Sequence, residues 1–269
     1  MTTKLAFIGA GRMAEALISG LISRKLLAPD EIIVADIDAG RLGALSELYS
    51  VVTAADNADA VRRVDFVLLA VKPQHIEPVV TGLRDALSPD KTIISIAAGV
   101  TVASLRRLIG FDLPIVRVMP NAPALVNEGI SGVAFPPGLA VDKRDFVDRL
   151  LESAGAVIHV DEGDIDAVTA VSGSGPAYFF LFVRELARAG AAAGLDSDTA
   201  LALARQTFIG SAALMARTGR SEDDLIGSVA SPGGTTEAAL DSFSGSKIEE
   251  IMRDAVQAAL ARAKELARR

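Results

Sequence analysis

Residues Lys4 to Ala14 read Lys-Leu-Ala-Phe-Ile-Gly-Ala-Gly-Arg-Met-Ala, an apolar run that ends in a glycine-rich turn. Apolar residues then recur at helical spacing, so the stretch predicts a strand, a tight turn and a helix. In the pattern G-x-G-x-x-A, Gly9 makes the turn, Gly11 lets a ligand approach the backbone, and the small Ala14 lets the helix pack closely on the strand. The fold is therefore expected to begin with a strand–turn–helix unit.

A second predicted strand, Ile32 to Ala35, ends in Asp36. Because this strand follows the glycine turn in sequence, we interpret the turn as a dinucleotide-binding site rather than merely a tight bend. A carboxylate at Asp36 is placed to bond the ribose 2′-hydroxyl of NAD and to repel the 2′-phosphate of NADP, which favours NADH. Arg41 offers the opposite reading, since an arginine just past this strand can bind a 2′-phosphate. A solvated loop is the alternative for both residues.

Further strands are predicted at 65–71, 92–97, 115–119 and 157–160. Nearly continuous apolar runs are typical of strands buried on both faces of a parallel sheet. Residues 1–160 are thus predicted to form a Rossmann-type, doubly wound α/β domain. Lys72, just after the third strand, either faces a ligand or is an exposed lysine at a strand end. The proline-clamped stretch 117–123 suggests a rigid pocket wall.

The pattern changes after residue 160, and residues 161–269 read as alanine-rich helices without a convincing strand. Phe179, Phe180 and Phe182 lie in one helix that is apolar all round, and such a helix must be buried. Helices are also predicted at 199–215 and 248–266. Because so small a helical domain cannot cover every apolar face by itself, we expect it to form a helical dimer interface.

Ser231 to Leu240 reads Ser-Pro-Gly-Gly-Thr-Thr-Glu-Ala-Ala-Leu, a glycine turn that leads into an apolar helical run. The free N–H groups of the first helical turn carry partial positive charge, so the stretch is interpreted as a cradle for a carboxylate or phosphate. Thr235 and Thr236 add two hydroxyls there. An ordinary turn with an N-terminal cap is the alternative.

Composition excludes several classes of protein. With 27 basic and 34 acidic residues the net charge is −7 and no long basic run is present, so nucleic acid is not an expected partner. No apolar stretch has membrane-spanning length and no signal peptide is recognised, so a cytoplasmic location is predicted. The chain has no cysteine and only His75 and His159, which are read as structural, so no metal site is expected.

The ordered set of motifs G-A-G-R-M-A, A-V-K-P, S-I-A-A-G-V, R-V-M-P-N-A-P, V-S-G-S-G-P-A-Y and S-P-G-G-T-T-E-A-A-L resembles the pyrroline-5-carboxylate reductase family along the whole chain. The last motif is the specific one, since many dehydrogenases share the first. The resemblance implies reduction of Δ1-pyrroline-5-carboxylate to L-proline by NADPH or NADH, the final step of proline biosynthesis. It also implies a homodimer through the helical domain, with higher assemblies of dimers in some members.

The resemblance also implies site residues. Those for the cofactor are Ile8, Gly9, Ala10, Gly11, Arg12 and Met13 at the phosphates, Asp36 and Asn57 at the adenosine, and Ala70, Val71, Lys72, Pro73, Ile96, Ala97 and Ala98 at the nicotinamide. Those for the substrate are Ser231, Gly234, Thr235 and Thr236.

Hydride is expected to pass from the nicotinamide to the imine carbon, while the Thr236 hydroxyl bonds the ring nitrogen as the catalytic group. Two alternatives are a two-domain hydroxyacid dehydrogenase and a nucleotide-sensing protein without chemistry. The first calls for a lysine early in the second domain, where Pro176, Ala177 and Tyr178 stand instead. The second is disfavoured because Ser231, Thr235 and Thr236 are all present. Assembly size beyond the dimer and regulation by proline are not predicted.

Overall fold

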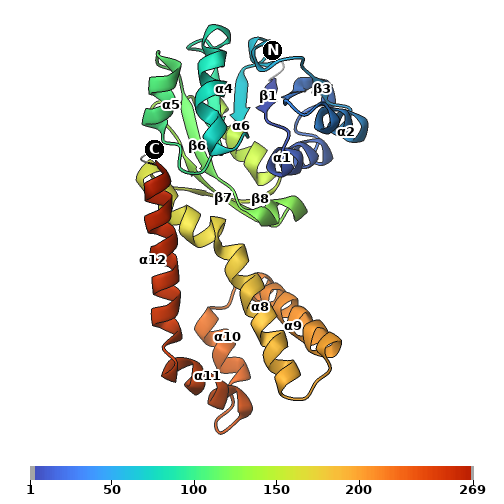
Figure 1. The fold of residues 1–269 in the computed structure, drawn as a ribbon, viewed down its shortest axis with the longest axis vertical. Helices are drawn as coiled ribbons and strands as arrows, with labels where there is room; N and C mark the ends of the chain where they lie inside the picture. The colour runs from blue at the N-terminus through green and yellow to red at the C-terminus, as the bar shows by residue number, and fades with distance from the viewer. Residues whose placement is uncertain (1–3, 268–269) are drawn as a thin grey trace. The chain divides into compact units, whose positions relative to one another are not determined.

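The computed structural model describes residues 4–267 and divides into two compact units, each of which is described by itself (Figure 1). The sheet unit contains residues up to Ser174 together with those from Ala259 onward, and the helical unit contains residues Gly175–Ala258. None of the helices in the described range is long and apolar enough to span a membrane.

The sheet unit is built on eight strands in the order β3-β2-β1-β4-β5-β6-β7-β8. The strands are β1 (Leu5–Ile8), β2 (Ile32–Ala35), β3 (Val52–Thr53), β4 (Phe66–Leu69), β5 (Thr92–Ser95), β6 (Ile115–Met119), β7 (Gly129–Ala134) and β8 (Gly155–His159). Every neighbouring pair is parallel except β6 and β7. Strand order reverses between β1 and β4, which makes a switch point at the carboxyl ends of these strands. The predicted doubly wound fold is confirmed.

Helices cover both faces of this sheet. They are α1 (Arg12–Ser23), α2 (Ala39–Tyr49), α3 (Asn57–Arg62), α4 (Ile76–Leu83), α5 (Val102–Ile109), α6 (Val141–Glu152) and α7 (Ile165–Val168). One core packs α1, α2 and α6 against one sheet face, and a second core packs α3, α4 and α5 against the other. Alternate strand residues supply the two cores, as Leu68 and Leu69 do from β4. This two-sided burial explains the continuous apolar runs in the sequence.

Two strands, β3 and β7, escape the sequence analysis. β3 has only two residues, and β7 contains Gly129 and Gly132, which weaken a strand pattern. Both glycines are required by close approaches. A Cβ at Gly129 would lie 2.8 Å from Ala124, and one at Gly132 would lie 2.7 Å from the Val168 side chain.

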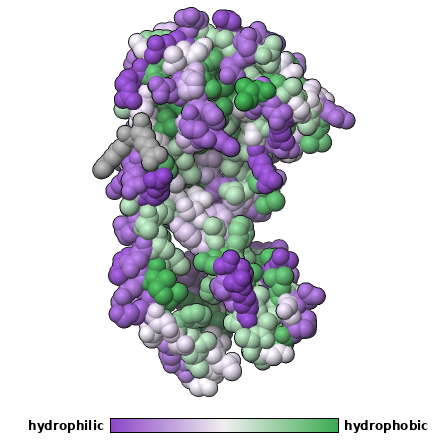
Figure 2. Space-filling view, viewed as in Figure 1, coloured by the Kyte–Doolittle hydropathy of each residue, from purple (hydrophilic) through white to green (hydrophobic). Residues whose placement is uncertain are grey.

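The helical unit contains α8 (Gly175–Ala192), α9 (Ser197–Thr218), α10 (Glu222–Val229), α11 (Thr235–Gly245) and the first part of α12 (Ile248–Ala267). The helices α8 and α9 pack on each other, and Phe179 and Phe208 meet there with ring centroids 5.6 Å apart. Phe180 is nevertheless 67% exposed. Figure 2 shows hydrophobic side chains at the surface of these helices. The predicted burial of this apolar helix is therefore not achieved within one chain.

The boundary between the units differs from the sequence estimate. We predicted a domain boundary near residue 160, where the last strand ends, but the compact sheet unit continues to Ser174 because α7 packs on β6 and β7. The end of α12 also belongs to the sheet unit. Ala263 is buried there, and Leu266 lies against Gly99, where an added Cβ would come within 2.9 Å of the leucine Cβ.

Candidate functional site

The glycine turn joins β1 to α1 at the switch point of the sheet. Gly9 has a φ of +106°, and a Cβ there would lie 2.8 Å from the Ala70 carbonyl carbon, so glycine is required twice over. Gly11 differs from Gly9. Its φ is −69° and a Cβ would meet no protein atom within 4 Å, so the chain's own packing does not call for glycine there. The space in front of Gly11 is open to a ligand.

The turn also presents unpaired N–H groups. Gly11 is the N-cap of α1 and makes no side-chain cap hydrogen bond. The first N–H groups of a helix have no partner within the helix and carry partial positive charge, which suits a bound phosphate. Small Ala14 is fully buried in the core under the helix, as its place in the pattern predicts.

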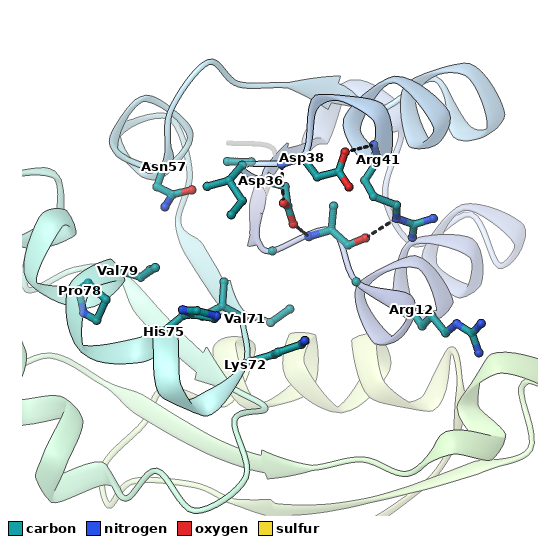
Figure 3. A pocket seen from close by; sticks show the side chains of 16 residues that line it. Arg12, Asp36, Asp38, Arg41, Asn57, Val71, Lys72, His75, Pro78 and Val79 are labelled. Carbon is teal, nitrogen blue, oxygen red and sulfur yellow. Dashed lines mark hydrogen bonds between the residues drawn. The ribbon is translucent and has the colours of Figure 1, made fainter. Parts of the chain in front are cut away.

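A cavity of about 670 Å³ opens in front of this turn (Figure 3). It lies at the carboxyl ends of β1, β2 and β4. Its lining residues are Gly9, Ala10, Gly11, Arg12, Ala35, Asp36, Ile37, Asp38, Arg41, Asn57, Ala70, Val71, Lys72, His75, Pro78 and Val79. Figure 3 shows Lys72 and His75 on the other side of the cavity from Asp36 and Arg41.

The cavity brings together nine of the predicted cofactor residues: Gly9, Ala10, Gly11, Arg12, Asp36, Asn57, Ala70, Val71 and Lys72. The other six do not line it: Ile8, Met13, Pro73, Ile96, Ala97 and Ala98. Ile8 and Ala97 are buried in the core, while Met13 and Ile96 pack against it. Their predicted places at the cofactor stay predictions.

Several lining residues were missed from the sequence. Ile37 and Asp38 follow Asp36 in the same loop, and Ile37 is fully exposed. His75, Pro78 and Val79 come from the short helix Pro73–His75 and from α4. His75, which the sequence analysis interprets as structural, lines the cavity (Figure 3). The signal was its position, since it follows the end of β4 by a few residues.

Asp36 is fixed to the glycine turn. Its Oδ2 accepts a hydrogen bond from the Ala10 N–H (2.5 Å), and its Oδ1 accepts one from the Asp38 N–H (2.9 Å) (Figure 3). Each carboxylate oxygen retains a second lone pair for a ligand. A fixed negative charge therefore stands at the end of β2, where it favours hydroxyl donors and opposes phosphate.

Arg41 binds the same turn from the other side. Its Nε donates to the Ala10 carbonyl oxygen (3.0 Å), and its Nη2 donates to Glu15 Oε2 on α1 (2.8 Å). Ala10 is thereby held through its N–H by Asp36 and through its C=O by Arg41. The two residues that the sequence left as rivals at the adenosine end cooperate in the structure to fix one peptide segment.

The stretch 117–123 does not line this cavity, and its expected role as a pocket wall stays a prediction. Arg117 is only 4% exposed and pairs with Asp166 (3.0 Å) and Glu162 (3.7 Å), and Glu162 also accepts a bond from the Val102 N–H (2.7 Å). Buried Asn121 accepts a bond from the Ile130 N–H (2.9 Å). These contacts join β6 to α5, α7 and β7, so this stretch also helps to hold the sheet unit together.

The predicted substrate residues lie together in the helical unit. Gly233 has a φ of +71°, the Gly234 N–H donates to the Ser231 carbonyl (2.9 Å), and α11 begins at Thr235. The N-cap is Gly234, without a side-chain cap bond, so Thr235 and Thr236 occupy the first helical turn and do not cap it. The capping alternative is therefore wrong for these two hydroxyls. Neither makes a hydrogen bond within the described residues.

Glu237 is an unforeseen member of this loop. Its Oε2 accepts a hydrogen bond from the Gly233 N–H (2.7 Å). This bond stabilises the left-handed backbone at Gly233, and it shows that N–H groups of the loop bind a carboxylate. Within residues 4–267 no three His, Cys, Asp or Glu side chains form a group suited to a metal ion.

The chain is similar to known proteins over nearly its full length. Residues 162–266 match the family described as "Pyrroline-5-carboxylate reductase dimerisation", and residues 4–99 match "NADP oxidoreductase coenzyme F420-dependent". A pyrroline-5-carboxylate reductase from Pseudomonas aeruginosa is 40% identical over 267 residues, covering 99% of this chain and 97% of that protein.

Solved structures agree. The pyrroline-5-carboxylate reductase from Coxiella burnetii has a TM-score of 0.94 at 36% identity, covering 99% of both chains. The Plasmodium falciparum pyrroline carboxylate reductase with NADP bound has a TM-score of 0.86 at 29% identity, covering 98% of both chains. Both units of the chain therefore have counterparts in these proteins.

Proposed function

This chain belongs to the pyrroline-5-carboxylate reductase family, and from that premise we propose that it reduces Δ1-pyrroline-5-carboxylate to L-proline with a nicotinamide dinucleotide, the last step of proline biosynthesis. The observation that carries the proposal is the similarity to a reductase along nearly the whole chain, because it spans the sheet unit and the helical unit alike. The cavity at the switch point supports it, since this is where doubly wound folds bind nucleotides.

The residues of the glycine turn fit a dinucleotide. Open space at Gly11 and the uncapped N-terminus of α1 suit the pyrophosphate, and Lys72 adds a positive charge on the opposite side. Asp36 and Asn57 suit the adenosine end, and Ala70 and Val71 suit the approach to the nicotinamide end. When bound, the nicotinamide supplies the hydride that reaches the imine carbon.

We assign the substrate to the loop before α11. Ser231 and Gly234 shape the turn, and the first-turn N–H groups of Thr235 and Thr236 hold the substrate carboxylate. The Thr236 hydroxyl hydrogen-bonds the ring nitrogen and relays its proton. A protonated imine is already electrophilic, so the loop's task is to hold the ring in place. The hydroxyl is available for this, because it has no partner within the described residues.

Cofactor preference, assembly and location complete the proposal. The fixed carboxylate of Asp36 favours NADH over NADPH by like-charge repulsion with the 2′-phosphate. The exposed apolar helices pair in a homodimer, and dimers can associate further. The cytoplasmic location expected from the sequence remains a prediction.

The direct test is spectrophotometric. Purified protein should oxidise NADH or NADPH only after pyrroline-5-carboxylate is added, and it should reduce NAD⁺ or NADP⁺ with L-proline at high pH. Absence of turnover with both dinucleotides, in protein shown by circular dichroism to be folded, contradicts the assignment.

A further inference from the structure

Arg41 occupies a position from which arginine commonly binds a 2′-phosphate. It lies in the first turn of α2, just past the carboxyl end of β2, and it lines the cavity. A free guanidinium there would favour NADPH, because it forms strong paired hydrogen bonds with phosphate. Sequence alone therefore leaves Asp36 and Arg41 in opposition.

The structure engages two of the three guanidinium nitrogens of Arg41 elsewhere. Nη2 pairs with Glu15 Oε2 at 2.8 Å, and Nε donates to the Ala10 carbonyl at 3.0 Å. The side chains of Arg41 and Glu15 are 36% and 30% exposed, so the pair is partly shielded from solvent. Figure 3 shows the bond from Arg41 to the backbone of the turn.

We infer that Glu15, on α1, is a specificity-determining residue that favours NADH by holding the Arg41 guanidinium against the glycine turn. The inference rests on the proposed dinucleotide site. With Glu15 in place, Arg41 is a positioning residue for Ala10 and acts equally on both dinucleotides. Asp36 is then the unopposed charge that meets the adenosine ribose. Without Glu15, Arg41 Nη2 loses its carboxylate partner and a 2′-phosphate can take that place.

The test measures Kd values of NADH and NADPH by calorimetry, which needs neither substrate nor turnover. In Glu15→Ala the ratio of the NADH Kd to the NADPH Kd should rise about tenfold, since one charge-assisted hydrogen bond is worth roughly that factor. Glu15→Gln should shift the ratio in the same direction by less, and it serves if Glu15→Ala is unstable. Glu47→Ala removes an exposed carboxylate from α2 that has no ion pair within the described residues, and it should leave the ratio unchanged.

Arg41→Met completes a double-mutant cycle. In the wild-type background it should weaken both dinucleotides by the same factor, because Arg41 then only positions the turn. In the Glu15→Ala background it should abolish the gained NADPH affinity.

Three results overturn the inference: a ratio unchanged within twofold in both Glu15 variants, a gain that persists without Arg41, or a selective loss of NADPH affinity in Arg41→Met alone. Failure of the proposed reaction looks different, since dinucleotides would bind without reduction of pyrroline-5-carboxylate. If neither dinucleotide binds, the site and the inference fall together.

Discussion

The two units of this chain differ in how much apolar side-chain surface each buries within itself. The sheet unit encloses two cores of fully buried leucine, isoleucine, valine and phenylalanine. The buried apolar residues of the helical unit are three alanines, Ala187, Ala200 and Ala204. Of its phenylalanines, Phe208 is half-buried and the others, Phe179, Phe180, Phe182 and Phe243, are exposed. Since burying a large side chain contributes about 1.5–3 kcal/mol, the sheet unit holds its stability within one chain. We expect the helical unit to gain much of its stability by packing its exposed apolar side chains against a partner chain.

The largest expected effect is a loss of stability in the sheet unit. Leu68→Ala opens a cavity in a fully buried site on β4 and should lower the free energy of unfolding by about 3 kcal/mol. Chemical denaturation followed by circular dichroism measures this cost. The loss should not depend on protein concentration, because Leu68 is covered by its own chain. A cost that grows on dilution would contradict the contrast between the units.

The second prediction concerns dimer formation by the helical unit. Phe180→Glu places a charge on the exposed apolar face of α8, where wild-type protein should bury Phe180 against a partner chain. The dissociation constant of the dimer should rise about a hundredfold, as for a central interface residue. Sedimentation velocity across a dilution series measures it. Glu47→Ala on α2 is the control and should sediment as wild type; a stable 27.9 kDa wild-type species at micromolar concentration would refute the dimer.

The third prediction separates chemistry from stability in the helical unit. Thr236→Ala should lower kcat about tenfold to a hundredfold, with unchanged dinucleotide affinity and melting temperature, because Thr236 does not cap α11. Steady-state kinetics and thermal melts provide the readouts. Thr236→Ser keeps the hydroxyl and should retain most of the activity. If the serine variant is as slow as the alanine variant, the methyl group matters and the proton relay does not.

The smallest effect sharpens the description of the sheet unit. Gly11→Ala should weaken both dinucleotides about tenfold without destabilising the fold, because a Cβ there meets only ligand space. Gly9→Ala is the matched contrast, since it introduces strain of about 1–3 kcal/mol at a positive φ. Calorimetry and thermal melts of the two variants distinguish them. Equal losses of stability would show that both glycines serve packing alone.

Much of the fold could be predicted from the sequence, because the strands and helices of a doubly wound sheet have recognisable local sequence patterns. The strands Ile32–Ala35 and Ile115–Met119 are predicted to the residue, since buried parallel strands are uniformly apolar. β7 could not be predicted, because its glycines are required by contacts with Ala124 and Val168 and interrupt the strand pattern. A close approach of another residue to a glycine leaves no periodic signal in the sequence.

The candidate site divides in the same way. Gly9, Gly11 and Asp36 are predictable because one turn and one strand end suffice to place them. Pro78 and Val79 reach the cavity wall only through the packing of α4, which residue spacing does not predict, whereas His75 follows the end of β4 closely enough to be expected there. The partners of Arg41 are likewise invisible in sequence. Glu15 lies 26 residues from Arg41, and only the packing of α1 beside α2 brings them together.

The end of α12 makes the completion of the sheet unit depend on the order in which the chain is synthesised. Ala263 and Leu266 belong to the sheet unit, yet a ribosome adds them after every residue of the helical unit. The nascent sheet can therefore collapse early around its two cores, while the surface at Gly99 waits for the last turn of α12. The sheet unit is thus completed only after the whole helical unit has been synthesised, and a chain released before Leu266 is added leaves the surface at Gly99 uncovered.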